Sequence, residues 1–200
     1  MSDSSINKLE LVGTIKEGIE IGIKNVGPIL VNVLLYVLTC WIPYLNVGTT
    51  IGLTVGIVSK ASKGELIPFT EIFDSKYRKY MGEFFLTSGL VGVGVAIGMA
   101  FFIIPGIIIG IAWSLSLLLA IDKGKNPSEA ISLSNKCTYG NKGRMFGIYF
   151  LVSLAFGIVC GIFSLIPVLG FVLIFLTVIF MNFVFIGLQA SIYKQLTGNV

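Results

Sequence analysis

Long apolar runs without a single charged residue alternate along the chain with short segments that hold all of its charges. The runs cover residues 26–59, 84–121 and 145–193 and are 34, 38 and 49 residues long. The hydrocarbon core of a bilayer is about 30 Å thick, and roughly 20 helical residues cross it. Each run is too long for one membrane-spanning helix and long enough for two. The pattern therefore predicts an all-α integral membrane protein with six transmembrane helices.

An Ile-Pro step lies inside each run and recurs at intervals of 62 residues, at Pro43, Pro105 and Pro167. Proline lacks an amide donor and clashes with the preceding helical turn, so it commonly ends a helix. We interpret each step as the tip of a helical hairpin; the alternative is three kinks in fewer, longer helices. The chain is then a single transmembrane domain with pseudo-repeats over about 6–60, 61–122 and 123–195.

The composition excludes a soluble globular domain. Only 12% of the residues are charged, 55% are hydrophobic, and the mean hydropathy is +0.94. Soluble domains carry about 25% charged residues. A chain of this length with so few charges cannot cover a water-facing surface.

The positive charges indicate an orientation. All 14 Lys and Arg residues lie outside the apolar runs, on the side opposite the predicted tips. Cytoplasmic segments of membrane proteins carry an excess of Lys and Arg. We therefore expect a multi-pass membrane protein with both termini in the cytoplasm. The net charge of +4 reflects this bias and not a nucleic-acid-binding patch.

Each predicted hairpin follows a segment with features of an amphipathic cytoplasmic helix, at about 11–23, 68–80 and 127–138. Asn126, Pro127 and Glu129 are start signals for the third. In the second, aromatic side chains recur at three- and four-residue steps beside cations, which is typical of a helix in the membrane interface. Simple packing against the ends of the spans is the alternative. The predicted interfacial or headgroup-contacting residues are Phe69, Phe73, Tyr77, Lys76, Arg78, Lys79 and Arg144.

Glycines at four-residue steps mark candidate helix contacts. Small residues at this spacing let helix backbones approach closely in lipid. The triple Gly48, Gly52 and Gly56 lies on one face of the second predicted span, and we predict that it packs against another helix. The same step occurs at Gly94/Gly98, Gly106/Gly110 and Gly157/Gly161.

One stretch resembles a known group of proteins. Residues 100–155 contain a Pro-Gly tip, an acidic residue that ends a span, Glu-Ala and Ser on a short helix, and then Gly-Asn followed by Arg and Phe. These residues are Pro105, Gly106, Asp122, Glu129, Ala130, Ser134, Gly140, Asn141, Arg144 and Phe146. The stretch is similar to a broad group of uncharacterised bacterial membrane proteins that includes the membrane domain of some glycerophosphoryl diester phosphodiesterases. The resemblance implies a six-span fold and a location in a bacterial inner membrane. We expect no phosphodiesterase activity because the 200 residues leave no room for that domain.

The residues needed for catalysis are sparse. The chain has no histidine, the commonest acid–base residue and metal ligand, and no carboxylate lies within a predicted span. Ionisable groups inside the membrane usually mark ion or proton pathways. We therefore expect neither enzymatic activity nor a cofactor.

Two functional hypotheses follow. The first is a non-catalytic scaffold or accessory subunit that contacts lipid or a partner at the cytoplasmic face. The second is a channel or transporter for a neutral or amphipathic solute, as a monomer or an oligomer. The expected partners are membrane lipids, together with a protein partner or a second copy of the chain, and no nucleic acid.

Overall fold

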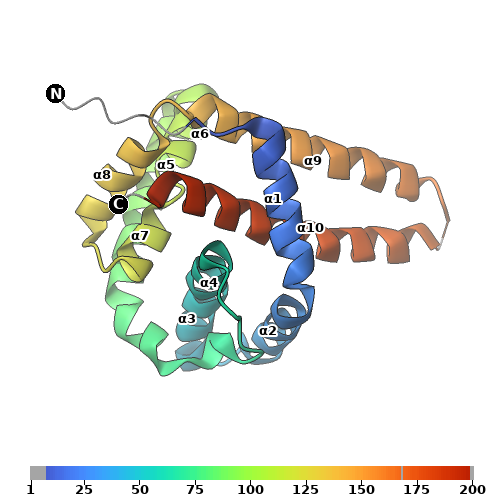
Figure 1. The fold of residues 1–200 in the computed structure, drawn as a ribbon, viewed down its shortest axis with the longest axis horizontal. Helices are drawn as coiled ribbons and strands as arrows, with labels where there is room; N and C mark the ends of the chain where they lie inside the picture. The colour runs from blue at the N-terminus through green and yellow to red at the C-terminus, as the bar shows by residue number, and fades with distance from the viewer. Residues whose placement is uncertain (1–7, 168, 199–200) are drawn as a thin grey trace.

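A computed structural model describes residues 8–167 and 169–198, and all of the regular structure in these residues is helical (Figure 1). The α-helices are α1 Leu11–Lys24, α2 Val26–Thr39, α3 Pro43–Ile51, α4 Ile57–Lys63, α5 Met81–Phe101, α6 Ile103–Ala112, α7 Ser116–Asp122, α8 Pro127–Thr138, α9 Lys142–Ser164 and α10 Leu169–Thr197. A π-helical turn, Gly52–Gly56, joins α3 to α4, and two 3₁₀-helices, Glu71–Phe73 and Ser75–Tyr80, precede α5.

Several of these helices are long and apolar enough to cross a membrane. Among the described residues they are Ser75–Phe101, Ile103–Asp122, Lys142–Ser164 and Leu169–Thr197, and α1 with α2 would add a fifth span although the two are bent by 69°. The chain thus has the helices of an all-α, multi-pass membrane protein. The expected six spans are not all present as regular long helices, because α2 has 14 residues and the helical stretch from Pro43 to Lys63 is interrupted by the π-helical turn.

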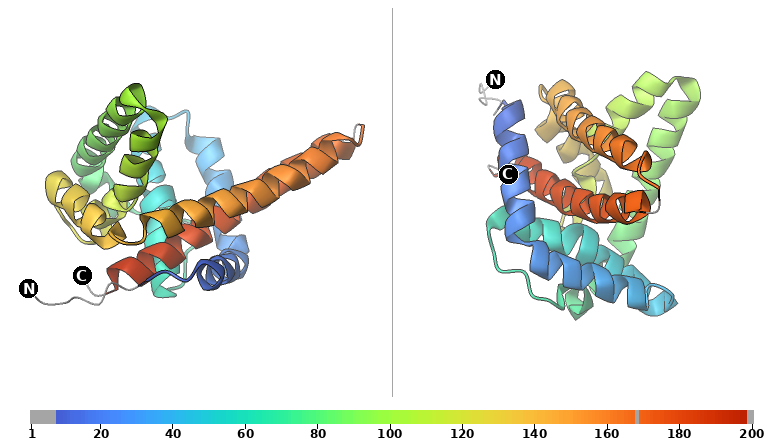
Figure 2. Two further views of the ribbon diagram at one scale, coloured as in Figure 1. Left: turned by 90° about the horizontal axis from the view of Figure 1, so that it is seen from above. Right: turned by 90° about the vertical axis from the view of Figure 1, so that its right-hand side faces the viewer.

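Consecutive helices form three apolar pairs, which we call the arms: α2–α3, α5–α6 and α9–α10. Figure 2 shows that the arms diverge, with α9 and α10 running side by side far beyond the rest of the molecule. Side chains at the turns of the arms are exposed, among them Trp41, Phe102 and Leu165. The arms therefore do not form a closed parallel bundle. The predicted threefold pseudo-repeat remains a prediction.

The buried core lies at the opposite end of the arms, in what we call the hub: α1, α4, residues 64–80, α7 and α8, with the adjoining parts of α9 and α10. Buried side chains of α9 lie in its first half, such as Met145 and Ile148, and those of α10 cluster in its second half, such as Leu188 and Tyr193. They pack with Ile57, Leu118 and other residues in one hydrophobic cluster. The core thus occupies the same end as the charged segments.

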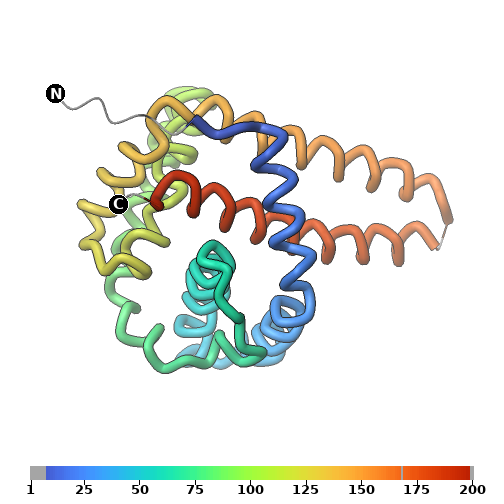
Figure 3. The backbone as a smooth tube through the Cα atoms, viewed as in Figure 1, coloured from blue at the N-terminus to red at the C-terminus, as the bar shows by residue number. Residues whose placement is uncertain are grey.

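Helix α1 crosses the base of the α9–α10 arm (Figure 3). The crossing is very close: a Cβ atom on Gly18 would lie 2.8 Å from the Cα of Leu188, and one on Gly22 would lie 2.5 Å from the backbone oxygen of Phe183. Glycines four residues apart on one face permit this approach. The contact joins the first described helix to the last.

The segment that precedes α5 differs from the predicted amphipathic α-helix over 68–80. It forms two short 3₁₀-helices separated at Asp74, whose backbone is extended at φ −58° and ψ 121°. The Asp74 side chain accepts a hydrogen bond from the backbone N–H of Lys76 at 3.0 Å, which caps the second 3₁₀-helix. Asp side chains commonly interrupt helices through such local bonds. By contrast, α8 starts as predicted, with Pro127 first and Asn126 accepting from the N–H of Glu129 at 2.9 Å.

Candidate functional site

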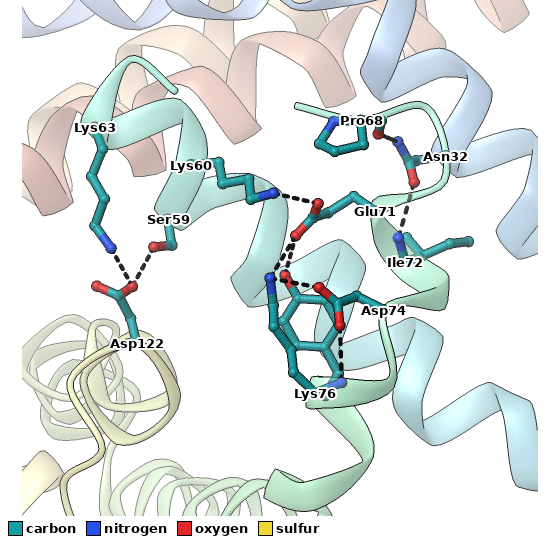
Figure 4. A network of polar contacts seen from close by, with 11 residues as sticks. Asn32, Ser59, Lys60, Lys63, Pro68, Glu71, Ile72, Asp74, Lys76 and Asp122 are labelled. Atoms are coloured by element: carbon teal, nitrogen blue, oxygen red, sulfur yellow. Dashed lines mark hydrogen bonds and ion pairs between the residues drawn. The ribbon is translucent and has the colours of Figure 1, made fainter. Parts of the chain in front are cut away.

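Glu71 is the centre of a polar cluster in the hub (Figure 4). Its side chain is buried, with 3% of the residue exposed. Lys60 of α4 pairs with it at 2.6 Å and Lys76 at 3.2 Å, and the Tyr77 hydroxyl donates to the same carboxylate. Lys76 also reaches Asp74 at 2.9 Å. A carboxylate buried in this way needs such partners, because an unpaired buried charge is strongly unfavourable.

The partners keep both carboxylates ionised. Burial alone would raise the pKa of Glu71, but hydrogen bonds from Lys60, Tyr77 and Lys76 outweigh it and hold the pKa below its ordinary value. The backbone and side-chain hydrogen bonds from Lys76 lower the pKa of Asp74 in the same direction. A general acid near neutral pH needs a raised pKa, so neither group has the properties of one.

A second cluster is built on Asp122, the last residue of α7. Ser59 donates to its carboxylate, Lys63 pairs with it at 2.6 Å, and the Tyr193 hydroxyl donates to it at 2.8 Å. These partners come from α4 and from the end of α10. One carboxylate therefore joins three helices that are far apart in the sequence.

Asn32, fully buried in α2, attaches that helix to the hub. Its amide nitrogen donates to the backbone oxygen of Pro68 at 2.8 Å, and its side-chain oxygen accepts from the N–H of Ile72 at 3.1 Å (Figure 4). Buried polar groups are normally hydrogen-bonded in this way. The asparagine thus satisfies two backbone groups of the segment that precedes α5.

A pocket of about 230 Å³ separates the Glu71 and Asp122 clusters. Its walls include Lys60, Lys63, Lys76, Glu65 and Tyr80. The three lysines face carboxylates at 2.6 to 3.2 Å, so the charges in the pocket are largely compensated. No group of three potential metal ligands occurs among the residues that the structure describes. The arrangement is suited to holding the hub segments in fixed positions.

The three glycines of the second predicted span face residues 72–78. A Cβ atom on Gly48 would lie 3.2 Å from Arg78, one on Gly52 would lie 2.7 Å from the Cα of Ile72, and one on Gly56 would overlap the Tyr77 hydroxyl. The glycine face therefore packs against the segment expected in the membrane interface. Of the other glycine pairs, Gly98 and Gly106 bring α5 and α6 together, whereas Gly157 and Gly161 have no atom within 4 Å among the described residues outside their own helix backbone.

The predicted aromatic stripe is divided between surface and core. Phe69 is 56% exposed and Phe73 is half-buried against the core cluster, but Tyr77 is only 3% exposed. The interpretation of Tyr77 as a headgroup-facing residue is therefore wrong, because burial on the glycine face and the bond to Glu71 take its ring inside. Lys79 is exposed, and the Arg78 guanidinium lies 5.5 Å from the centre of the Tyr44 ring.

The three prolines lie where consecutive helices of an arm meet. Pro43 is the first residue of α3, Pro105 is the third residue of α6, and Pro167 lies between α9 and α10. Proline is tolerated in the first turn of a helix, where its missing N–H has no partner to lose. These positions are consistent with turns between helices.

The sequence pattern predicted Lys76 at the membrane interface and placed Asp122 in the stretch that carries the resemblance, but it did not identify Glu71 and Asp122 as the centres of two ion-paired clusters. Lys76 and Tyr77 lie five and six positions from Glu71. Lys60, however, lies 11 positions from Glu71, and the partners of Asp122 lie 59 to 71 positions away, so no local motif marks the clusters. A signal was nevertheless present, since Asp122 directly follows a 38-residue run without charge and begins the next charged segment.

No family model, curated protein or solved structure matches the chain. The resemblance of residues 100–155 to uncharacterised bacterial membrane proteins therefore stays a prediction.

Proposed function

We propose that the protein is a non-catalytic scaffold or accessory subunit of a bacterial inner membrane, with the hub and both termini at the cytoplasmic face. The arms lie in the bilayer and offer their apolar surfaces to lipid and to a membrane partner. The observation that carries this proposal is the separation of the molecule into a hub with ion pairs and arms whose exposed side chains are apolar.

The α9–α10 arm illustrates the argument. Beyond its crossing with α1, large apolar side chains are exposed on both helices, including Leu154 and Ile158 of α9 and Phe171 and Phe175 of α10. Exposing an apolar surface of this kind to water is unfavourable, whereas lipid chains cover it without a loss of free energy. Because lipid is as apolar as these side chains, helix association in a membrane relies on close packing and not on hydrophobicity. The arm can therefore stay separate until a partner with a complementary surface packs against it.

The charge distribution favours a scaffold over a channel. Lysines of the hub pocket are paired with Glu71, Asp74 or Asp122, so little charge is left to attract an ionic solute. No Asp, Glu, Lys or Arg occurs in the arm residues 145–193 that could line a polar path. A polar path through a membrane usually contains ionisable residues that face the protein interior or water.

Photo-crosslinking in native membranes tests the proposal. A photoreactive amino acid at Ile158, which is exposed on α9, should yield a discrete adduct with one membrane protein or with a second copy of the chain. The matched control is Ile148, which is fully buried on the same helix and should yield no such adduct. Lipid adducts alone at Ile158 would contradict a partner-binding role, and solute flux through liposomes that contain the pure protein would favour the channel hypothesis.

A further inference from the structure

Arg144 carries a buried donor without a partner. The residue lies in the first turn of α9, and its Nη1 atom has no hydrogen bond within the described part of the chain. Buried polar atoms are nearly always satisfied, and an exception calls for a missing ligand, ion or water. Arg is also the side chain best suited to binding phosphate, through its fork of N–H donors.

Arg144 also lines a shallow pocket at the N-terminal end of α1. The pocket has a volume of about 350 Å³ and is lined by Lys8, Leu9, Glu10, Leu11 and Arg144. Glu10 is the one acidic residue of this lining, and its carboxylate folds back over α1, since its Oε2 atom would lie 2.9 Å from a Cβ on Gly13. Two cations and one carboxylate leave the pocket with a net positive charge.

An apolar notch lies further along the same two helices. It has a volume of about 230 Å³ and lies where α1 crosses the α9–α10 arm. Its lining is wholly apolar and includes Ile15, Ile19, Leu151, Ala155, Phe156 and Phe180. A notch of this kind accepts a hydrocarbon chain and repels a polar group.

The pocket and the notch belong to one seam between α1 and α9. On α1 their lining residues Leu11, Ile15 and Ile19 follow at four-residue steps, so they share a helix face. On α9 Arg144, Leu151 and Ala155 share a face for the same reason, and Leu11 contacts this face at Gly147. Eleven residues separate Arg144 from Ala155 along α9, which corresponds to about 17 Å. This length is close to the roughly 15 Å of hydrocarbon in one leaflet.

We propose that this seam binds one anionic phospholipid, with its phosphate at Arg144 and Lys8 and an acyl chain in the notch between α1, α9 and α10. Arg144 Nη1 is buried and has no acceptor among the described residues, so a rotation of the guanidinium toward the pocket lets the phosphate accept its hydrogen bond, and the acyl chain fills the apolar notch. A free phosphate would bind only in the positively charged pocket, and a neutral lipid would bind mainly through its chain in the notch. The inference rests on the proposed function only in placing α9 in a bilayer.

Lipid titration of the purified full-length protein in a neutral detergent tests the site. Phosphatidylglycerol, phosphatidylcholine with the same chains, glycerol 3-phosphate and inorganic phosphate are added separately. Thermal unfolding gives the apparent affinity, and native mass spectrometry gives the number of lipids bound. We expect one phosphatidylglycerol per protein, bound about tenfold more tightly than phosphatidylcholine because of the charge-assisted bonds to phosphate. The two phosphates without chains should give no shift in unfolding temperature.

Two pairs of variants separate the headgroup from the chain. Arg144→Gln should reduce phosphatidylglycerol affinity to near that of phosphatidylcholine, whereas Lys136→Gln, which removes an exposed cation of α8, should change nothing. Ala155→Phe fills the notch and should weaken both lipids, while Leu154→Phe, on the neighbouring exposed position, should not.

The proposal is overturned if Arg144→Gln binds phosphatidylglycerol like the wild type, or if inorganic phosphate alone gives the same Arg144-dependent shift. If Arg144→Gln fails to fold, the proposal is overturned when Ala155→Phe binds phosphatidylglycerol as tightly as the wild type does. A protein that binds phosphatidylglycerol at this seam but crosslinks no partner at Ile158 would keep the lipid site and lose the scaffold function, so the two proposals fail separately.

Discussion

A Cβ atom placed on Gly187 of α10 would lie 2.0 Å from the backbone oxygen of Gly18 in α1. Real Cβ atoms essentially never approach another heavy atom so closely, and Gly187 would also meet the backbone nitrogen of Gly22 at 2.7 Å. Neither helix can retreat without opening the crossing that holds α1 against the base of the α9–α10 arm. The absence of a side chain at position 187 is therefore a requirement of the fold.

Gly187→Ala should destabilise the protein because the added methyl group forces the two backbones apart. Overpacking of this kind costs typically 1–3 kcal/mol, and the rigid backbone neighbours here place the variant at the upper end of that range. The control is Gly157→Ala on α9, where the new Cβ meets no described atom within 4 Å outside its own helix backbone. Thermal unfolding in detergent gives the unfolding temperatures of the two variants. Equal temperatures would contradict the close crossing.

Gly56 and Tyr77 should be coupled energetically, since a Cβ on Gly56 would overlap the Tyr77 hydroxyl. Gly56→Ala alone should be strongly destabilising, but it should cost less in a Tyr77→Ala background, where space is free. Contacting residues typically show coupling energies of about 0.5–3 kcal/mol in such a double-mutant cycle. Additive effects would show that the glycine face does not pack against Tyr77.

Glu71 should make the free energy of unfolding decrease as the pH falls. Its pKa in the folded protein is held below the ordinary value of 4.5, so the ionised form stabilises the fold above that pH. This contribution is lost as the pH falls through the folded-state pKa. We expect Glu71→Gln to be less stable at neutral pH by about 2 kcal/mol, the value of charge-assisted hydrogen bonds, and to lose less stability on acidification than the wild type does.

Denaturant titrations of the wild type and Glu71→Gln at a series of pH values from neutral to acid measure this difference. Glu20→Gln, at an exposed position of α1, is the matched control and should follow the wild type. If Glu71→Gln and the wild type lost stability in parallel on acidification, the Glu71 cluster would not be the source of the acid sensitivity.

The helical class and the membrane helices could be predicted because they depend on local properties of the chain. Charge-free runs of 34 to 49 residues are compatible with few structures other than membrane-spanning helices. The start of α8 follows from Asn126 and Pro127 alone. The structure of the segment 68–80 could not be predicted from local properties alone. Aromatic residues at three- and four-residue steps fit an α-helix as well as two 3₁₀-helices, and the choice depends on Asp74, Glu71 and the glycine face that receives Tyr77.

The divergence of the arms and the hub network are long-range features. Ser59 and Tyr193 lie 63 and 71 positions from Asp122, and only the folded chain brings them together. Glycines four residues apart likewise predict a close helix contact but do not indicate which helix is the partner. Gly18 and Gly22 use it against α10, whereas a Cβ on Gly157 or Gly161, at the same spacing, meets no atom of another described helix within 4 Å.

Single-cysteine labelling in intact cells tests most directly the central claim that the hub lies at the cytoplasmic face and the turns of the arms lie across the membrane. Cys40, Cys137 and Cys160 are first replaced, and one cysteine is introduced at Lys63, Lys125 or Asn46. With a membrane-impermeant maleimide, Lys63→Cys and Lys125→Cys should be labelled only after the cells are opened, whereas Asn46→Cys, near the turn between α2 and α3, should be the site that reacts from outside. Labelling of Lys63→Cys in intact cells, with Asn46→Cys protected, would contradict the account.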